Sequence, residues 1–132
     1  MELLIDFPGG ATVEAHFETF SVLTDRPLAN GGKGSAPTSF AIFLASIGTC
    51  AGAYVLGFCR ERGLITEGIR IIERVRRDTA SGLAEEIELE IQVPPAFPAK
   101  YYDALVRSVN QCTVKKQFEY PPVFKVFTST GG

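Results

Sequence analysis

The chain has 132 residues, of which 45% are hydrophobic and 21% are charged, and its formal net charge is −2. This length suits one domain over residues 1–132 that buries its own core without the help of disulfides. The slightly acidic balance argues against nucleic acid or an anionic membrane as a partner. Three cysteines and a single histidine exclude a secreted disulfide framework and a zinc or iron site, so we expect no metal.

The N-terminal segment MELLIDFPGG has no basic region and only a short apolar stretch before Asp6. It does not read as a secretory signal, so we expect a cytoplasmic protein. Alternating apolar residues predict strands over residues 3–7, 11–17 and 20–23, and His16 is interpreted as an ordinary residue of the second strand. The next segment, TDRPLANGGKGSA, is rich in Gly, Asn and Pro and is predicted to be a loop.

The segment SFAIFLASIGTCAGAYVLGFC, residues 39–59, carries no charged side chain. Pro37 and Thr38 favour a helix start just before it, and Gly63 favours its end. Its length also fits a membrane span, but half of it consists of small or weakly polar residues and its flanks show no positive-inside bias. Because the rest of the chain alternates as a half-buried sheet, we expect the buried helix of a soluble protein and no membrane.

The composition of this helix predicts that the protein forms an oligomer. A helix that is apolar all round must be buried all round. A domain of this size offers one sheet, and two helices on one sheet leave one helical face uncovered. Small residues at positions 45, 48 and 52 would let a second backbone approach closely. The packing therefore predicts a homodimer.

The second half of the chain completes an α+β pattern. Residues 69–76 and 86–93 alternate on either side of a turn, which predicts an antiparallel hairpin with arginines facing glutamates on its exposed side. An amphipathic helix is predicted over residues 99–111, and a short closing strand after residues 121–122. The element order favours an α+β fold with helices packed on an antiparallel sheet.

Two of the three cysteines are candidates for chemistry. Cys50 lies in the middle of the central helix, and Cys112 continues the apolar face of the second helix, so helix-on-sheet packing could bring them together. Cys59 is interpreted as a small buried hydrophobe. Because Cys50 lies too far from the start of its own helix for the dipole to stabilise a thiolate, we expect a nearby cation, Arg26 or Lys33 of the preceding loop.

These motifs resemble a known family. The segment APTSFAIFLASIGTCAGAYVLGFCRERGL is similar to the central helix of the OsmC/Ohr family, the osmotically inducible and organic hydroperoxide resistance proteins. In that family an Ala- and Gly-rich helix leads to a reactive cysteine and ends in a basic stretch and Gly-Leu. The segment VNQCTVKKQFEYPPVFKV resembles the second-cysteine motif of the family. The resemblance covers nearly the whole chain and implies an OsmC/Ohr-like fold in an intertwined homodimer.

The resemblance also implies a reaction. By position, the Cys50 thiolate would attack the hydroperoxide, and Cys112 would convert the resulting sulfenic acid into a disulfide. An external dithiol, in the family often a lipoylated protein, would reopen that disulfide, and no cofactor would be needed. Arg26, the only arginine of the loop, would be the activating arginine.

The chain departs from the peroxidase pattern early in the helix, where Phe40 and Ala41 stand in place of the glutamate of the family enzymes. It is therefore closer to the OsmC-like branch. Apolar residues near the thiol, Phe40, Phe43 and Tyr54, would favour a lipophilic hydroperoxide, although they also suit a plain core. The alternative function is a non-catalytic dimer that binds a small apolar ligand or acts as a redox sensor.

Overall fold

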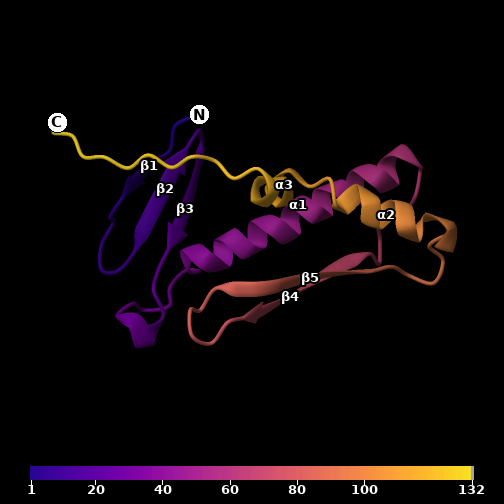
Figure 1. Cartoon of the computed structure of the whole chain (residues 1–132), viewed down its shortest axis with the longest axis horizontal. Helices are drawn as coiled ribbons and strands as arrows, with labels where there is room; N and C mark the ends of the chain where they lie inside the picture. The colour runs from indigo at the N-terminus through magenta and orange to yellow at the C-terminus, as the bar shows by residue number, and fades with distance from the viewer. Residues whose placement is uncertain (132) are drawn as a thin grey trace. The chain divides into compact units, whose positions relative to one another are not determined.

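The computed structural model describes residues 1–131. Its strands are β1 (Leu4–Asp6), β2 (Val13–Phe17), β3 (Phe20–Thr24), β4 (Arg70–Arg77) and β5 (Ala84–Gln92), and its helices are α1 (Ser39–Glu61), α2 (Tyr102–Val109) and α3 (Thr113–Glu119), with 3₁₀ turns η1 (Leu28–Asn30) and η2 (Ala99–Tyr101). The chain forms two compact units, Met1–Ser46 and Ile47–Gly132, and α1 runs through both (Figure 1). One domain over residues 1–132 stays a prediction.

The first unit is a three-stranded antiparallel meander followed by a loop and the first turns of α1. Leu4 pairs with His16 across β1 and β2, and Val13 pairs with Thr24 across β2 and β3. The turn between β1 and β2 closes where Thr12 N donates to Gly9 O at 3.1 Å. The three strands predicted from alternation are thus confirmed to within one or two residues at each end.

The helix α1 begins and ends at the predicted signals. The Thr38 hydroxyl accepts from the backbone N–H of Ala41 at 3.1 Å, which satisfies one of the free donors of the first turn. At the other end Gly63 has φ +64°, a left-handed conformation that favours glycine, and Leu64 N donates back to Cys59 O at 2.8 Å.

By length and composition alone, α1 is able to cross a membrane, with a mean hydropathy of 1.8 over its most apolar window, of which 28% is buried. A core helix of a soluble protein meets the same criteria. Ala45, Thr49, Ala53 and Leu56 are exposed on one face of this helix. A soluble helix covered by a second subunit stays a prediction.

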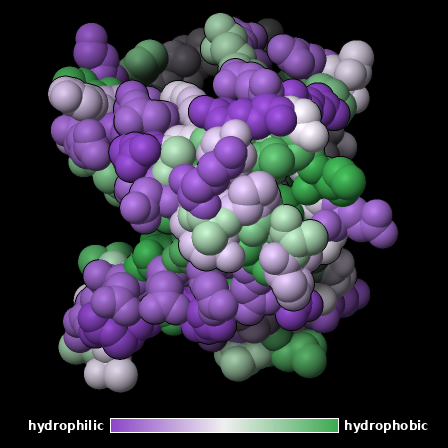
Figure 2. Space-filling view, turned by 90° about the vertical axis from the view of Figure 1, so that its right-hand side faces the viewer, coloured by the Kyte–Doolittle hydropathy of each residue, from purple (hydrophilic) through white to green (hydrophobic). Residues whose placement is uncertain are grey.

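The second unit packs the remainder of α1 between helices and a hairpin. Its buried core comprises Ala51, Val55, Phe58 and Cys59 of α1, Phe97 of the following loop, and Leu105 and Val109 of α2. Alternate residues of β4 and β5, such as Ile71, Leu89 and Ile91, pack against this core. Figure 2 shows two bands of hydrophilic side chains with hydrophobic ones between them.

The hairpin has the predicted register, with Arg74 opposite Glu88 and Ile71 opposite Ile91. On its exposed face Arg74 contacts both Glu88 and Glu90 at 2.8 Å, and Arg76 contacts Glu85. Exposed pairs of this kind contribute about 0–1 kcal/mol each. These Arg–Glu pairs help to set the register of β4 against β5, and they lie on the face of the hairpin that is exposed to solvent.

The helix predicted over residues 99–111 is confirmed to within two residues, since η2 and α2 together run from Ala99 to Val109. Elsewhere the structure differs from the expectations, because α3, which no pattern had indicated, follows α2. Within the described chain the strands form two sheets, one of three strands and one of two, where one sheet was expected. The closing strand is not formed, because residues 121–131 pair with no other strand and their apolar side chains are exposed.

Candidate active site

Two of the free cysteines lie together in the second unit. Cys50 is half-buried near the middle of α1, whereas Cys112 directly precedes α3 and is 2% exposed. Their thiols are hydrogen-bonded to each other. Two thiols in such contact are candidates for a disulfide. The catalytic roles of both residues stay predictions.

The short connection between α2 and α3 positions Cys112. Cys112 N donates to Val109 O at 3.0 Å, which closes a turn after α2, and Lys116 N donates to Cys112 O at 3.0 Å, which begins α3. The first backbone N–H groups of a helix have no acceptor within the helix. Those of Thr113, Val114 and Lys115 are therefore available to groups that lie beside the start of α3.

The Cys50 thiol uses these donors. Burial alone would raise the pKa of Cys50, because it disfavours the thiolate. Hydrogen bonds from the Cys112 thiol and from the N–H groups of Val114 and Thr113 act in the opposite direction, and together they hold the pKa of Cys50 below its ordinary value. A lowered pKa increases the thiolate fraction, which is the nucleophilic form of cysteine.

The pKa of Cys112 is shifted in the opposite direction, above its ordinary value. Burial raises the pKa of the Cys112 thiol first, and the hydrogen bond to Cys50 raises it further, since that bond needs the Cys112 proton. The N–H groups of Lys115 and Val114 offset only part of this rise. Of the two thiols, Cys50 is therefore the first to lose its proton, with Cys112 as its hydrogen-bond donor.

The second unit by itself supplies groups that stabilise the Cys50 thiolate. A cation was expected because Cys50 is far from the start of its own helix. Within the second unit, the groups that lower the pKa of Cys50 are the Cys112 thiol and two backbone N–H groups from the start of α3, a helix that the sequence had not predicted. Arg26 and Lys33 belong to the first unit, and stabilisation of the thiolate by either of them stays a prediction.

Arg26 lies in the first unit, in the loop after β3, and its role at the thiol stays a prediction. The loop is held by the buried carboxylate of Asp25, which accepts from Arg26 N at 2.7 Å and from Ser35 Oγ at 2.6 Å. Hydrogen bonds from the Ser35 hydroxyl and N–H, and from other N–H groups of the loop, lower the pKa of Asp25 to about 2. Arg26 also lines a cavity of about 450 Å³ with Phe40.

The three aromatic candidates fall in different places. Phe40 and Phe43 belong to the first unit, where their ring centroids are 5.7 Å apart, and Phe43 is 38% exposed. Tyr54 lies one turn after Cys50 on α1, and its hydroxyl is 3.4 Å from the Thr113 hydroxyl of α3. Tyr54 is thus beside the start of α3, and substrate binding by all three residues stays a prediction.

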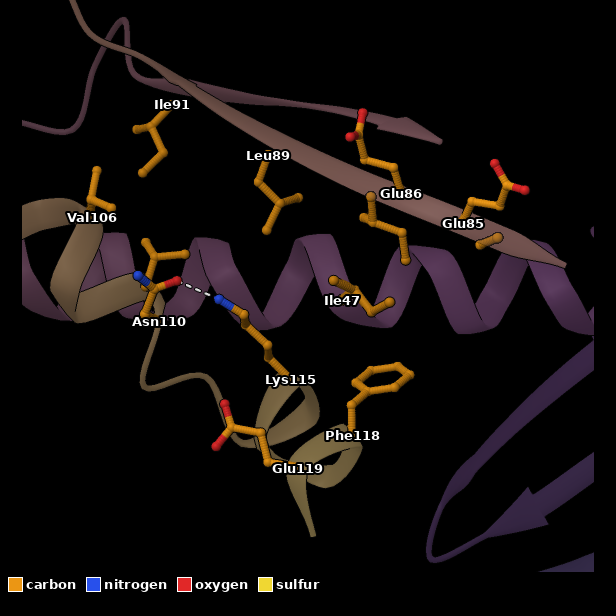
Figure 3. A pocket seen from close by; sticks show the side chains of 13 residues that line it. Ile47, Glu85, Glu86, Leu89, Ile91, Val106, Asn110, Lys115, Phe118 and Glu119 are labelled. Atoms are coloured by element: carbon orange, nitrogen blue, oxygen red, sulfur yellow. Dashed lines mark hydrogen bonds between the residues drawn. The ribbon is translucent and has the colours of Figure 1, made fainter. Parts of the chain in front are cut away.

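A cavity of about 510 Å³ opens in the second unit between α1, β5, α2 and α3 (Figure 3). Its apolar lining includes Ile47, Leu89, Val109 and Phe118, and Ile47 is three residues before Cys50 on α1. At its mouth Lys115 donates a hydrogen bond to Asn110, as Figure 3 shows. The cavity has room for a small apolar molecule, and neither Cys50 nor Cys112 is among the residues that line it.

Cys59 lies nine residues beyond Cys50 on the same helix but belongs to the core. It is completely buried, and burial raises the pKa of its thiol, with a smaller opposing effect from Arg62. This agrees with its interpretation as a small buried hydrophobe.

One group of side chains on the meander offers ligand atoms to a cation. Atoms of Asp6, Glu14 and His16 lie within 4.8 Å of one another, and the His16 ring is 3.1 Å from the Asp6 carboxylate. The Asp6 carboxylate is exposed, and exposed groups of this kind are common without a metal. That the protein needs no metal stays a prediction.

Sequence reasoning missed a carboxyl group on the apolar face of the hairpin. Glu73 pairs with Leu89 and shares the inner face of β4 with Ile71 and Val75. Its Oε1 is so near α1 that a Cβ at Gly48 would lie 2.5 Å from it, and its Oε2 is buried without a hydrogen-bond partner. Burial raises the pKa of Glu73. Counting every second residue from Ile69 would have revealed it.

The fold and parts of the sequence match known proteins. The profile of the OsmC family, OsmC-like protein, matches residues 32–127. No curated protein matches the sequence significantly. Solved structures with this fold include a protein of Psychrobacter arcticus 273-4 assigned to osmotic stress induction and the detoxification response (17% identity, TM-score 0.75, covering 87% of this chain and 85% of that one).

Two further structures share the fold. One is an OsmC-like protein from Mycoplasma pneumoniae, with 13% identity, a TM-score of 0.72 and coverage of 89% of this chain and 86% of that one. The other is an organic hydroperoxide resistance protein OsmC from Legionella pneumophila, with 15% identity, a TM-score of 0.57 and coverage of 89% of both chains. The predicted α+β fold with antiparallel strands is confirmed by these neighbours.

Proposed function

Because this chain belongs to the OsmC family, we propose that it acts in defence against oxidative stress by reducing organic hydroperoxides. The observation that carries the proposal is the thiol pair: Cys50 has a lowered pKa and is hydrogen-bonded to a second thiol, Cys112. The organic hydroperoxide resistance protein of similar fold supports the same role.

The proposed reaction has three steps. The Cys50 thiolate attacks the terminal peroxide oxygen, the O–O bond breaks, and the alkoxide takes up a proton and leaves as an alcohol, with Cys50 oxidised to a sulfenic acid. The Cys112 sulfur then attacks the Cys50 sulfur and releases water, which forms the disulfide. An external dithiol, such as a lipoylated protein, supplies two electrons and two protons and restores both thiols.

Other residues have proposed supporting roles. Arg26 is the proposed cation for the developing negative charge on the peroxide, and its anchored loop supports this role. Phe40, Phe43 and Tyr54 are the proposed contacts for the organic group of a lipophilic hydroperoxide. The proposed location is the cytoplasm, where dithiol reductants keep cysteines reduced.

The proposed working form is a homodimer. The exposed small-residue face of α1 supports this, since Cβ atoms built at Gly52 and Gly57 would contact nothing within 4 Å. The segment 121–131 supports it as well, because Val123, Phe124, Val126 and Phe127 are each at least 84% exposed. So many exposed apolar side chains favour a protein partner. Sedimentation at micromolar concentration without detergent tests this, and a monomer would contradict it.

A second candidate function is a non-catalytic dimer that binds a small apolar ligand. The observation that favours it is the apolar cavity of about 510 Å³ lined by α1, β5, α2 and α3. In that case the cysteines would serve as redox sensors or have no chemical role.

One experiment separates the two functions. The fully reduced protein is treated with one equivalent of an organic hydroperoxide, and its intact mass is measured. The peroxidase function predicts the loss of two hydrogens, mapped by peptides to a Cys50–Cys112 disulfide, and no such loss in Cys50→Ser. An unchanged mass with both thiols free would eliminate the peroxidase function and leave ligand binding.

A further inference from the structure

The loop between β3 and α1, which lies in the first unit, is folded around one buried carboxylate, that of Asp25, which is 4% exposed. Its Oδ1 accepts from Arg26 N at 2.7 Å, and its Oδ2 accepts from Lys33 N at 3.2 Å and from Ser35 N and Ser35 Oγ at 3.0 and 2.6 Å. The carboxylate therefore ties the backbone of Arg26 to the far end of the loop.

The loop holds the backbone of Arg26 from the other side as well. Arg26 O accepts from Gly34 N at 3.0 Å, and Gly34 has φ +63°, a left-handed conformation that favours glycine. A Cβ built at Gly32 would overlap Arg26 O, so this close approach also requires glycine. Both polar groups of the Arg26 backbone are thus hydrogen-bonded within the loop, and the loop sequence allows no looser arrangement at these two places.

The side chain of Arg26 is not used in this anchoring. Asp25 and Arg26 are neighbours of opposite charge, yet within residues 1–131 no carboxylate forms an ion pair with the Arg26 guanidinium. Hydrogen bonds from the Ser35 hydroxyl and from backbone N–H groups are sufficient to lower the pKa of Asp25 to about 2. Arg26 is exposed and lines the cavity of about 450 Å³ with Asn30 and Ser39. Its positive charge is therefore available to an anion that enters from outside.

We propose that Asp25 is a positioning residue for Arg26: its carboxylate fixes the Arg26 backbone through the loop and leaves the guanidinium unpaired for an external anion. A cation that is already held in place loses less conformational freedom when its anion binds. What the guanidinium then does, stabilising the negative charge that develops on the peroxide, rests on the proposed function. The anchoring of Arg26 is independent of any peroxide.

The variant Asp25→Asn weakens the anchoring with little change of shape. An asparagine side chain has one oxygen that accepts, and its amide nitrogen only donates. With the oxygen facing Lys33 and Ser35, the amide faces the Arg26 N–H, so that hydrogen bond is lost. We expect kcat/KM for an organic hydroperoxide, with a dithiol as reductant, to fall roughly 10- to 100-fold, the usual effect of a misplaced group. Full activity in a folded Asp25→Asn would overturn the proposal.

The matched control is Asp78→Asn, in the turn between β4 and β5. The Asp78 carboxylate also accepts from a backbone N–H in a loop, that of Ser81 at 3.0 Å, but this turn holds no proposed site residue. The same substitution there should leave kcat/KM within about twofold, as is usual for surface changes. If Asp78→Asn lost as much activity as Asp25→Asn, the effect would not be specific to Arg26 and the positioning role would be refuted.

A double-mutant cycle separates positioning from a merely structural role. In an Arg26→Ala background, Asp25→Asn should lower kcat/KM by no more than about twofold, because the guanidinium that Asp25 positions is already absent. A merely structural role of Asp25 would lower kcat/KM by the same factor with and without Arg26. Such additivity would contradict the proposal.

Amide hydrogen exchange on the unmodified chain requires no folded variant and no peroxide. The N–H groups of Arg26, Lys33 and Ser35 share one acceptor carboxylate, so each should exchange at least about tenfold more slowly than in an unfolded chain. An Arg26 N–H that exchanges as fast as in an unfolded chain would overturn the anchoring. A wild type that shows this protection and consumes no hydroperoxide would refute the proposed function alone.

Discussion

Cys50 and Cys59 lie on the same helix, nine residues apart in one uncharged apolar segment, yet their surroundings differ. Cys50 contacts the start of α3, where a thiol and two N–H groups lower its pKa. Cys59 lies in the core with Phe58 and Leu105, is completely buried, and has a raised pKa. Burial acts on both thiols in the same direction, so the Cys112 thiol and the N–H donors from the start of α3 account for the difference.

The comparison indicates that the direction in which the pKa of a thiol on α1 is shifted depends on what packs against the helix beside it. Glu73 is a third case, and its pKa is raised as that of Cys59 is: burial outweighs a hydrogen bond from the Gly48 N–H, and its buried Oε2 has no donor. A buried acidic group favours its neutral form when burial outweighs its donors, and it favours its anion when the donors outweigh burial.

The largest expected effect separates the two cysteines by activity. Cys50→Ser removes the proposed nucleophile and should lower hydroperoxide consumption at least about 1,000-fold. Cys59→Ala should leave the rate within about twofold and lower the free energy of unfolding by about 1 kcal/mol, because it leaves a small cavity. A peroxide consumption assay and a denaturant titration measure both. Equal loss of activity in the two variants would remove the distinction between them.

The second variant tests the partner of Cys50. Cys112→Ser keeps a hydroxyl donor beside Cys50 but cannot form a disulfide. Oxidation should stop at the Cys50 sulfenic acid, trapped by dimedone, and turnover with a dithiol should fall roughly 10- to 100-fold because the neighbouring thiol is lost. A disulfide that still forms within one chain, between Cys50 and Cys59, would contradict the assignment.

A smaller effect is expected at Glu73, in stability against pH. Its folded-state pKa lies above the ordinary value of 4.5, so its contribution to stability is complete below pH 4.5 and is lost as the pH rises through the folded-state pKa. Glu73→Gln should remove this decline, with a relative gain of about 1 kcal/mol at pH 7, the typical cost of an unsatisfied buried group. Urea titrations at several pH values measure it.

The control for Glu73 lies on the other face of the hairpin. Glu88 contacts Arg74 in water, so Glu88→Gln should change the free energy of unfolding by less than about 1 kcal/mol and leave its pH dependence largely as it was. If Glu73→Gln showed the same pH dependence of stability as the wild type, the raised pKa of Glu73 would be contradicted.

Local patterns were sufficient to predict most of the fold. The meander, α1 with its Thr38 cap and Gly63 terminus, and the hairpin register follow from alternation, capping and turn chemistry. What the sequence missed depends on tertiary contacts. The segment VKKQFE has no strong helical face, so α3 was not predicted, and the donors to Cys50 were missed with it. The alternation of residues 123–127 suits a strand, but a strand needs a partner, and none lies beside it in the described chain.

The central claim is that the Cys112 thiol and the donors from the start of α3 make Cys50, and not Cys59, the reactive thiol. The most direct test is the pH profile of iodoacetamide labelling at both cysteines in one reduced sample, resolved by peptide mass spectrometry. The midpoint for Cys50 should lie below the ordinary value of 9.0, and that for Cys59 above it, with slow labelling at every pH. A Cys50 midpoint at or above that of Cys59 would contradict the account.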